Sequence, residues 1–194
     1  MTNATVDAGT ESSRAVVVEI LQRLWHTKLS SIALLERWLG QTTDADIQAG
    51  LTNQIVDERR HATLIGEQIR RLGGRIGGQA TKDAVTRIFD EAASDREDVR
   101  KLFAFYRGVK AYTVDRCGHL MPHVDRTLAD VLEALSRDEE RHIRWADMRV
   151  QRLLTHEKMR ECNLLLGHVL GSLETAWGRH WRQLPWTNLK RRGA

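Results

Sequence analysis

Residues 57–61 read Asp-Glu-Arg-Arg-His and residues 138–142 read Asp-Glu-Glu-Arg-His, so the two pentapeptides differ only at the middle position. Apolar residues recur at helical spacing around both copies, which predicts that each copy lies on an amphipathic helix. Positions i and i+3 share one face of a helix, so Glu58 points the same way as His61, and Glu139 the same way as His142. Both pairs lie on apolar, inward stripes. The repeat therefore predicts two similar halves, each with an acid and a histidine facing the core.

The flanking sequence divides into five helices separated by turn residues. Gly40 ends the first helix, Thr43 caps the second, glycine pairs at 73–74 and 77–78 break the chain, and Pro122 ends the third. The stretch Ser-Asp-Arg-Glu at 94–97 has the form of a capping box for the third helix. A connector of about 20 residues, with a short helical piece at 83–93, precedes it. The predicted helices cover about 14–39, 43–72, 94–121, 126–154 and 156–182.

Short turns join the first and second helices, and the third and fourth, into two antiparallel hairpins. The long connector between the hairpins is typical of an all-α four-helix bundle with one crossover, here with an additional C-terminal helix. With 194 residues the chain is long enough for one domain with a substantial hydrophobic core. We expect a disordered leader at 1–13, the bundle at 14–184 and a basic tail at 185–194.

The duplicated Glu-x-x-His on the second and fourth helices resembles the ferritin-like superfamily of dinuclear-metal carboxylate proteins. The resemblance covers the first four helices, which make up most of the chain, and it implies a ferritin-like bundle. It also implies that Glu58, His61, Glu139 and His142 are metal ligands. Carboxylate oxygens and imidazole nitrogens together suit iron or manganese. The expected activity is that of a non-haem oxidoreductase or oxygenase acting on a small-molecule substrate.

The superfamily pattern also needs one carboxylate on each of the first and third helices, and both are missing here. Counting back from each antiparallel turn places them near residues 25–30 and 106–111, and neither window contains an acid. The residue on the inward stripe is Lys28 in the first window and Lys110 in the second. The same replacement therefore occurs in both halves. Tyr106 lies close to the second lysine and is predicted to be a core residue.

Two ammonium groups in place of two carboxylates change the charge balance of a buried metal site, where even one uncompensated ion costs several kcal/mol. Three hypotheses follow. In the first, the lysines lose their protons or point outward, and Glu58, His61, Glu139 and His142 hold a modified iron or manganese site. In the second, no metal binds, and the lysines form a salt-bridge cluster with both glutamates in a scaffold or ligand-binding domain. In the third, Lys28 and Lys110 are catalytic and perform metal-free acid–base or imine chemistry.

The composition, with 41% hydrophobic and 29% charged residues and two prolines, suits long amphipathic helices. No apolar run approaches the ~20 residues that a membrane span requires. Residues 1–13 lack the apolar segment of a signal peptide, and two cysteines form no disulfide framework. The net charge of +4 is concentrated in a C-terminus rich in tryptophan and arginine, which we interpret as a solvated end of the bundle. We expect a soluble, cytoplasmic homodimer without a nucleic-acid partner.

Overall fold

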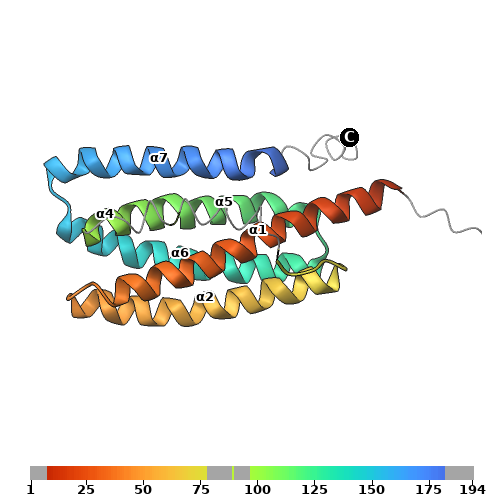
Figure 1. Cartoon of the computed structure of the whole chain (residues 1–194), viewed down its shortest axis with the longest axis horizontal. Helices are drawn as coiled ribbons and strands as arrows, with labels where there is room; N and C mark the ends of the chain where they lie inside the picture. The colour runs from red at the N-terminus through yellow and green to blue at the C-terminus, as the bar shows by residue number, and fades with distance from the viewer. Residues whose placement is uncertain (1–7, 78–88, 90–96, 182–194) are drawn as a thin grey trace, which may run out of the picture.

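The computed structural model describes residues 8–77, 89 and 97–181, and the regular elements in these ranges are all helices joined by short turns. The long helices lie side by side (Figure 1), which confirms the predicted all-α class for this part of the chain. In the same ranges, none of the helices has the length and apolar character needed to cross a membrane. The elements are α1 (Ala8–Leu39), α2 (Ala45–Arg71), α4 (Asp98–Leu102), the π-helix η1 (Phe103–Lys110), α5 (Ala111–Leu120), the 3₁₀-helix η2 (Met121–His123), α6 (Arg126–Leu153) and α7 (His156–Trp181).

The first two helices, α1 and α2, form an antiparallel hairpin. α1 begins at Ala8, so the predicted leader at 1–13 overlaps the start of this helix, and it ends immediately before Gly40 as predicted. The N-cap of α2 is Asp44 rather than the predicted Thr43. The carboxylate of Asp44 accepts a hydrogen bond from the backbone N of Ile47 at 3.0 Å, which satisfies one donor of the first turn.

The chain leaves α2 through Gly73, whose φ of 80° lies in the left-handed region that glycine adopts without strain. Of the helical piece predicted at 83–93, the structure describes Phe89, which is helical and buried against Phe105 with ring centroids 5.9 Å apart. The capping box predicted at 94–97 lies outside the described residues except for Glu97, which is the N-cap of α4 but makes no capping hydrogen bond through its side chain. The predicted tail at 185–194 also lies outside them.

The third predicted helix is not a uniform α-helix but the succession α4, η1 and α5. In η1 the wider π-type turn replaces the α-helical turn for eight residues, a feature often found near functional sites. All of these residues except Arg107 are buried, because η1 packs against α6 as well as against α7. Figure 1 shows α7 running alongside this part of the chain. Gly108 makes the close approach feasible, since a Cβ there would lie 3.0 Å from Val169 Cγ1 and 3.3 Å from Leu166 Cδ1.

Helix α6 packs against α2, η1 and α5 and completes the surroundings of the core. It starts after Asp125, whose side chain accepts a hydrogen bond from the backbone N of Leu128 at 3.0 Å. The indole of Trp145 on α6 lies directly over Gly50 on α2, where a Cβ would approach the ring to 2.1 Å. Helices α2 and α6, which carry the repeated pentapeptides, are therefore held close together.

Candidate functional site

Six titratable side chains from four helical segments meet in the protein interior. Each is at most 3% exposed to solvent, so water does not screen their charges effectively. We call these six residues the central cluster. They are Lys28 of α1, Glu58 and His61 of α2, Lys110 at the end of η1, and Glu139 and His142 of α6. The structure thus brings together all of the residues that the sequence singled out.

Both lysines of the central cluster contact both of its carboxylates. Lys28 Nζ donates to Glu139 Oε1 and lies 3.3 Å from Glu58 Oε2. Lys110 Nζ donates to Glu58 Oε1 and, at 2.5 Å, to Glu139 Oε2. Two positive and two negative groups therefore form one closed set of ion pairs.

Both lysines are 2% exposed and point inward, so the hypothesis that they turn out to solvent is wrong. Their positions follow from the antiparallel pairing of the helices, which places Lys28 opposite Glu58 across the first hairpin. In the second half, Lys110 is the last residue of the π-helix η1, and its side chain reaches Glu58 and Glu139. Lys110 Nζ lies 5.1 Å from the ring centroid of Phe105 and 5.7 Å from that of Tyr106, within the range of a cation–π interaction.

Each histidine of the central cluster is oriented by an aspartate on the opposite helix. His61 Nε2 lies 3.0 Å from Asp138 Oδ2, and His142 Nε2 lies 3.0 Å from Asp57 Oδ2. An ionised carboxylate only accepts hydrogen bonds, so Nε2 carries the proton in both rings and a neutral ring presents its Nδ1 lone pair to the cluster. His142 Nδ1 lies 3.3 Å from Lys110 Nζ, which can donate to it. Among the residues that the structure describes, His61 Nδ1 has no hydrogen-bond partner, and it lies about 4 Å from Glu58 Oε2 and Glu139 Oε1.

Two arginines extend this cross-helix arrangement toward the surface. Arg60 bonds Asp57 on its own helix at 2.7 Å and Asp138 on α6 at 2.6 Å. Arg141 bonds Asp138 on its own helix at 2.7 Å and Asp57 on α2 at 2.8 Å. The two halves are therefore related by an approximate twofold symmetry.

Reasoning from the sequence missed that the aspartates orient the histidines, although the aspartate before each Glu-x-x-His was a signal for it.

The pKa shifts follow from burial and from the neighbouring charges. Burial by itself lowers the pKa of Lys28, but the carboxylates of Glu139 and Glu58 outweigh it and hold the pKa above its usual value. Burial raises the pKa of Glu139, yet the ammonium groups of Lys110 and Lys28 bring it well below its usual value. Burial, followed by the charge of Lys28, lowers the pKa of His61. Near pH 7 these groups are therefore a cation, an anion and a neutral ring, respectively.

Tyr106 is a fully buried neighbour of the central cluster, in agreement with its expected role as a core residue. Its hydroxyl donates a hydrogen bond to Gln54 Oε1 at 2.6 Å. Burial raises the pKa of Tyr106 well above its usual value despite this bond, so the phenol stays protonated. The ring contributes an apolar wall beside Lys110.

Three residues of the central cluster could hold one metal ion. Glu58, Glu139 and His142 each offer a ligand atom, and these atoms lie within 4.8 Å of one another. However, Lys110 Nζ contacts all three residues and therefore takes the position that a metal ion would need. A pair of divalent ions does not fit these residues, because two carboxylates cannot balance two metal ions and two ammonium groups in a buried site.

No protein family, curated protein or solved structure matches this chain. The arrangement of the central cluster and the surface of the helices around it are therefore the basis for assigning a function.

Proposed function

We propose that this protein is a metal-independent variant of the ferritin-like four-helix bundle that serves as a ligand-binding scaffold rather than as a redox enzyme. In this assignment α1, α2, the α4–η1–α5 segment and α6 are the four helices, and α7 is an addition. The observation that carries the proposal is the contact of Lys110 Nζ with Glu58, Glu139 and His142. An ammonium group stands where the resemblance to the superfamily would place a metal ion.

Charge balance supports this proposal. The two lysines and two glutamates compensate each other without any metal, and each charged group has hydrogen-bonding partners within the cluster. Ion pairs with this degree of burial are stable only when every charge is paired, because an unpaired buried ion carries a large desolvation cost. The balanced cluster therefore lets the helices pack around a charged centre without a metal ion.

The raised pKa of Lys28 disfavours the hypothesis of imine chemistry. A lysine that forms an imine must be neutral, and enzymes achieve this by lowering the pKa of the amine through burial or a neighbouring cation. Lys28 has the opposite environment, with two carboxylates in contact with its Nζ. Its charge is used for ion pairing.

The deciding measurement is the metal content of tag-free protein expressed with added iron and manganese. We expect the folded wild-type protein to contain neither metal, and the double variant Lys28→Glu/Lys110→Glu to gain divalent-metal binding because it restores four carboxylates. The matched comparison is Lys28→Gln/Lys110→Gln, which has the same side-chain shapes but adds no carboxylates. It leaves only Glu58, Glu139 and His142 as one group of ligands, so we expect it to bind fewer metal ions per chain than the glutamate variant. Near-stoichiometric iron or manganese in the wild-type protein would refute the proposal.

A second candidate function, a modified iron or manganese site of an oxidoreductase, is favoured by the histidines. Metal-bound histidines usually donate their other ring N–H to a carboxylate, and Asp138 and Asp57 hold His61 and His142 in this way. Metal binding would require Lys110 to lose its proton or to move away. In that case wild-type protein would contain metal, and His61→Ala would lose it. Retention of bound metal in His61→Ala would show that this ligand assignment is wrong.

A further inference from the structure

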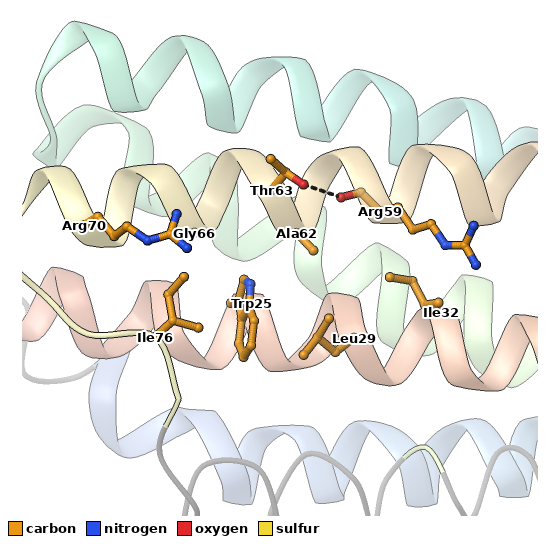
Figure 2. A pocket seen from close by; sticks show the side chains of 9 residues that line it. All are labelled: Trp25, Leu29, Ile32, Arg59, Ala62, Thr63, Gly66, Arg70 and Ile76. Carbon is orange, nitrogen blue, oxygen red and sulfur yellow. Dashed lines mark hydrogen bonds between the residues drawn. The ribbon is translucent and has the colours of Figure 1, made fainter.

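A groove runs along the outer surface between α1 and α2, away from the central cluster. Figure 2 shows its lining, with apolar side chains from α1 on one side and two arginines of α2 on the other. Its volume of ≈ 380 Å³ is within the range of small-ligand sites, about 300–1,000 Å³. We call it the α1–α2 groove. The residues that matter for ligand binding are Trp25, Leu29, Ile32, Arg59, Arg70 and Ile76.

The two arginines lie at opposite ends of the α1–α2 groove. They are separated by three turns of α2, about 16 Å, and so share one face of the helix. Arg59 is already paired with Glu36, at 2.7 Å. Arg70 makes no ion pair with any residue that the structure describes. The groove therefore has one compensated end and one end with an available positive charge.

The part of the groove next to Arg70 is apolar and is kept open by a glycine. A Cβ at Gly66 would lie 3.1 Å from Ile76 Cδ1 and 3.6 Å from Trp25 Nε1, so a larger residue would fill the floor. Trp25 directs its indole Nε1 toward Gly66, and Arg70 lies further toward the end of the groove (Figure 2). The charged end at Arg70 is thus followed along the groove by Trp25 and by the apolar side chain of Leu29, which is 38% exposed.

We propose that the α1–α2 groove binds the free carboxylate of a medium-chain fatty acid, with the head group at Arg70 and the alkyl chain along Trp25, Leu29 and Ile32. The available charge of Arg70 complements a single anionic group, and the apolar side chains bury the chain that follows it. The volume suits a small molecule rather than a folded partner. This inference deepens the proposed function, because it names the class of ligand that the scaffold carries.

The test is calorimetric titration of the full-length protein with dodecanoate, below its micelle concentration, and with dodecanol as the uncharged probe. We expect dodecanoate to bind, and Arg70→Gln to weaken its binding about tenfold or more, as the loss of a charge-assisted hydrogen bond implies. The control Arg137→Gln changes an exposed arginine of α6 outside the groove and should bind dodecanoate as the wild-type protein does. Equal affinity for dodecanol and dodecanoate, or an unchanged affinity in Arg70→Gln, would overturn the proposal.

A pair of variants at one position separates charge from shape. Leu29→Glu and Leu29→Lys interrupt the apolar wall equally, but only the first repels a carboxylate, so we expect Leu29→Glu to bind dodecanoate much more weakly than Leu29→Lys. Similar affinities of the two variants would contradict the assignment of an anionic ligand. Binding to phosphatidylglycerol vesicles without binding of free dodecanoate would instead identify a membrane surface and overturn the proposal. These titrations do not depend on metal content. Absence of dodecanoate binding would therefore not contradict the proposal that the bundle is metal-independent, and metal in the wild-type protein would not contradict fatty-acid binding in the groove.

Discussion

Removing one charge from the central cluster should destabilise the protein strongly, and removing a second, opposite charge should restore most of the lost stability. The variant Lys110→Met keeps an unbranched side chain of similar length but leaves one ammonium group with two carboxylates. Breaking a buried pair in this way costs about 3–5 kcal/mol, because an uncompensated charge stays in the interior. For a chain of this size that corresponds to a decrease in Tm of roughly 6–20 °C.

The second variant, Glu58→Gln, removes one carboxylate with little change in shape. Alone, Glu58→Gln leaves two ammonium groups with one carboxylate. We expect it to lower the free energy of unfolding by about as much as Lys110→Met does. Combined with Lys110→Met it leaves Lys28 paired with Glu139, so the charges balance again. Replacing a buried pair by neutral groups of similar volume is often close to neutral in free energy, and the double variant should regain most of the stability.

Urea denaturation followed by circular dichroism at pH 7 measures the free energies of unfolding of the wild type, both single variants and the double variant. Arg126→Met is the matched control, since Arg126 pairs with Asp130 at 2.7 Å but is 87% exposed, and it should cost less than about 1 kcal/mol. A loss of under about 1 kcal/mol in Lys110→Met, or a double variant no more stable than the single variants, would refute the charge balance of the cluster.

Two further predictions concern packing and pH. We expect Gly50→Ala to lower the free energy of unfolding by about 1–3 kcal/mol, because the new methyl group meets the ring of Trp145. Gly171 has open space around it, so Gly171→Ala should raise the free energy of unfolding by up to about 1 kcal/mol. Equal effects of the two substitutions in thermal melts would contradict this packing. Because the folded pKa of Glu139 lies below its usual value of 4.5, the stability that it contributes is complete above pH 4.5 and is lost as the pH falls further. Because the folded pKa of Lys28 lies above its usual value of 10.5, its contribution is complete below pH 10.5 and is lost as the pH rises further. Each group changes the free energy of unfolding by at most about 1.4 kcal/mol per pH unit. A free energy of unfolding that stays constant both below pH 4.5 and above pH 10.5 would show that the cluster is not ionised as described.

Regular helical geometry explains why the central cluster could be predicted from the sequence. Glu58 and His61 share a helix face because they are three residues apart, and this holds whatever surrounds the helix. The positions of Lys28 and Lys110 followed from counting along antiparallel helices on either side of short turns. The existence of the helices and their approximate ends are also local properties, set by apolar periodicity and by residues such as Gly40 and Pro122.

Features that depend on the approach of different helices could not be read from the sequence. The pairing of His61 with Asp138 joins residues of two helices, and it exists because α2 and α6 pack closely through Gly50 and Trp145. The π-helical turn of η1 is a small departure from α-helical geometry, and no residue pattern in the sequence predicted it. This segment packs against α7. The α1–α2 groove likewise depends on how far apart two packed helices lie. Sequence periodicity determined which residues face inward, whereas the tertiary contacts decided which partner each of them meets, because periodicity describes one helix and a contact requires two.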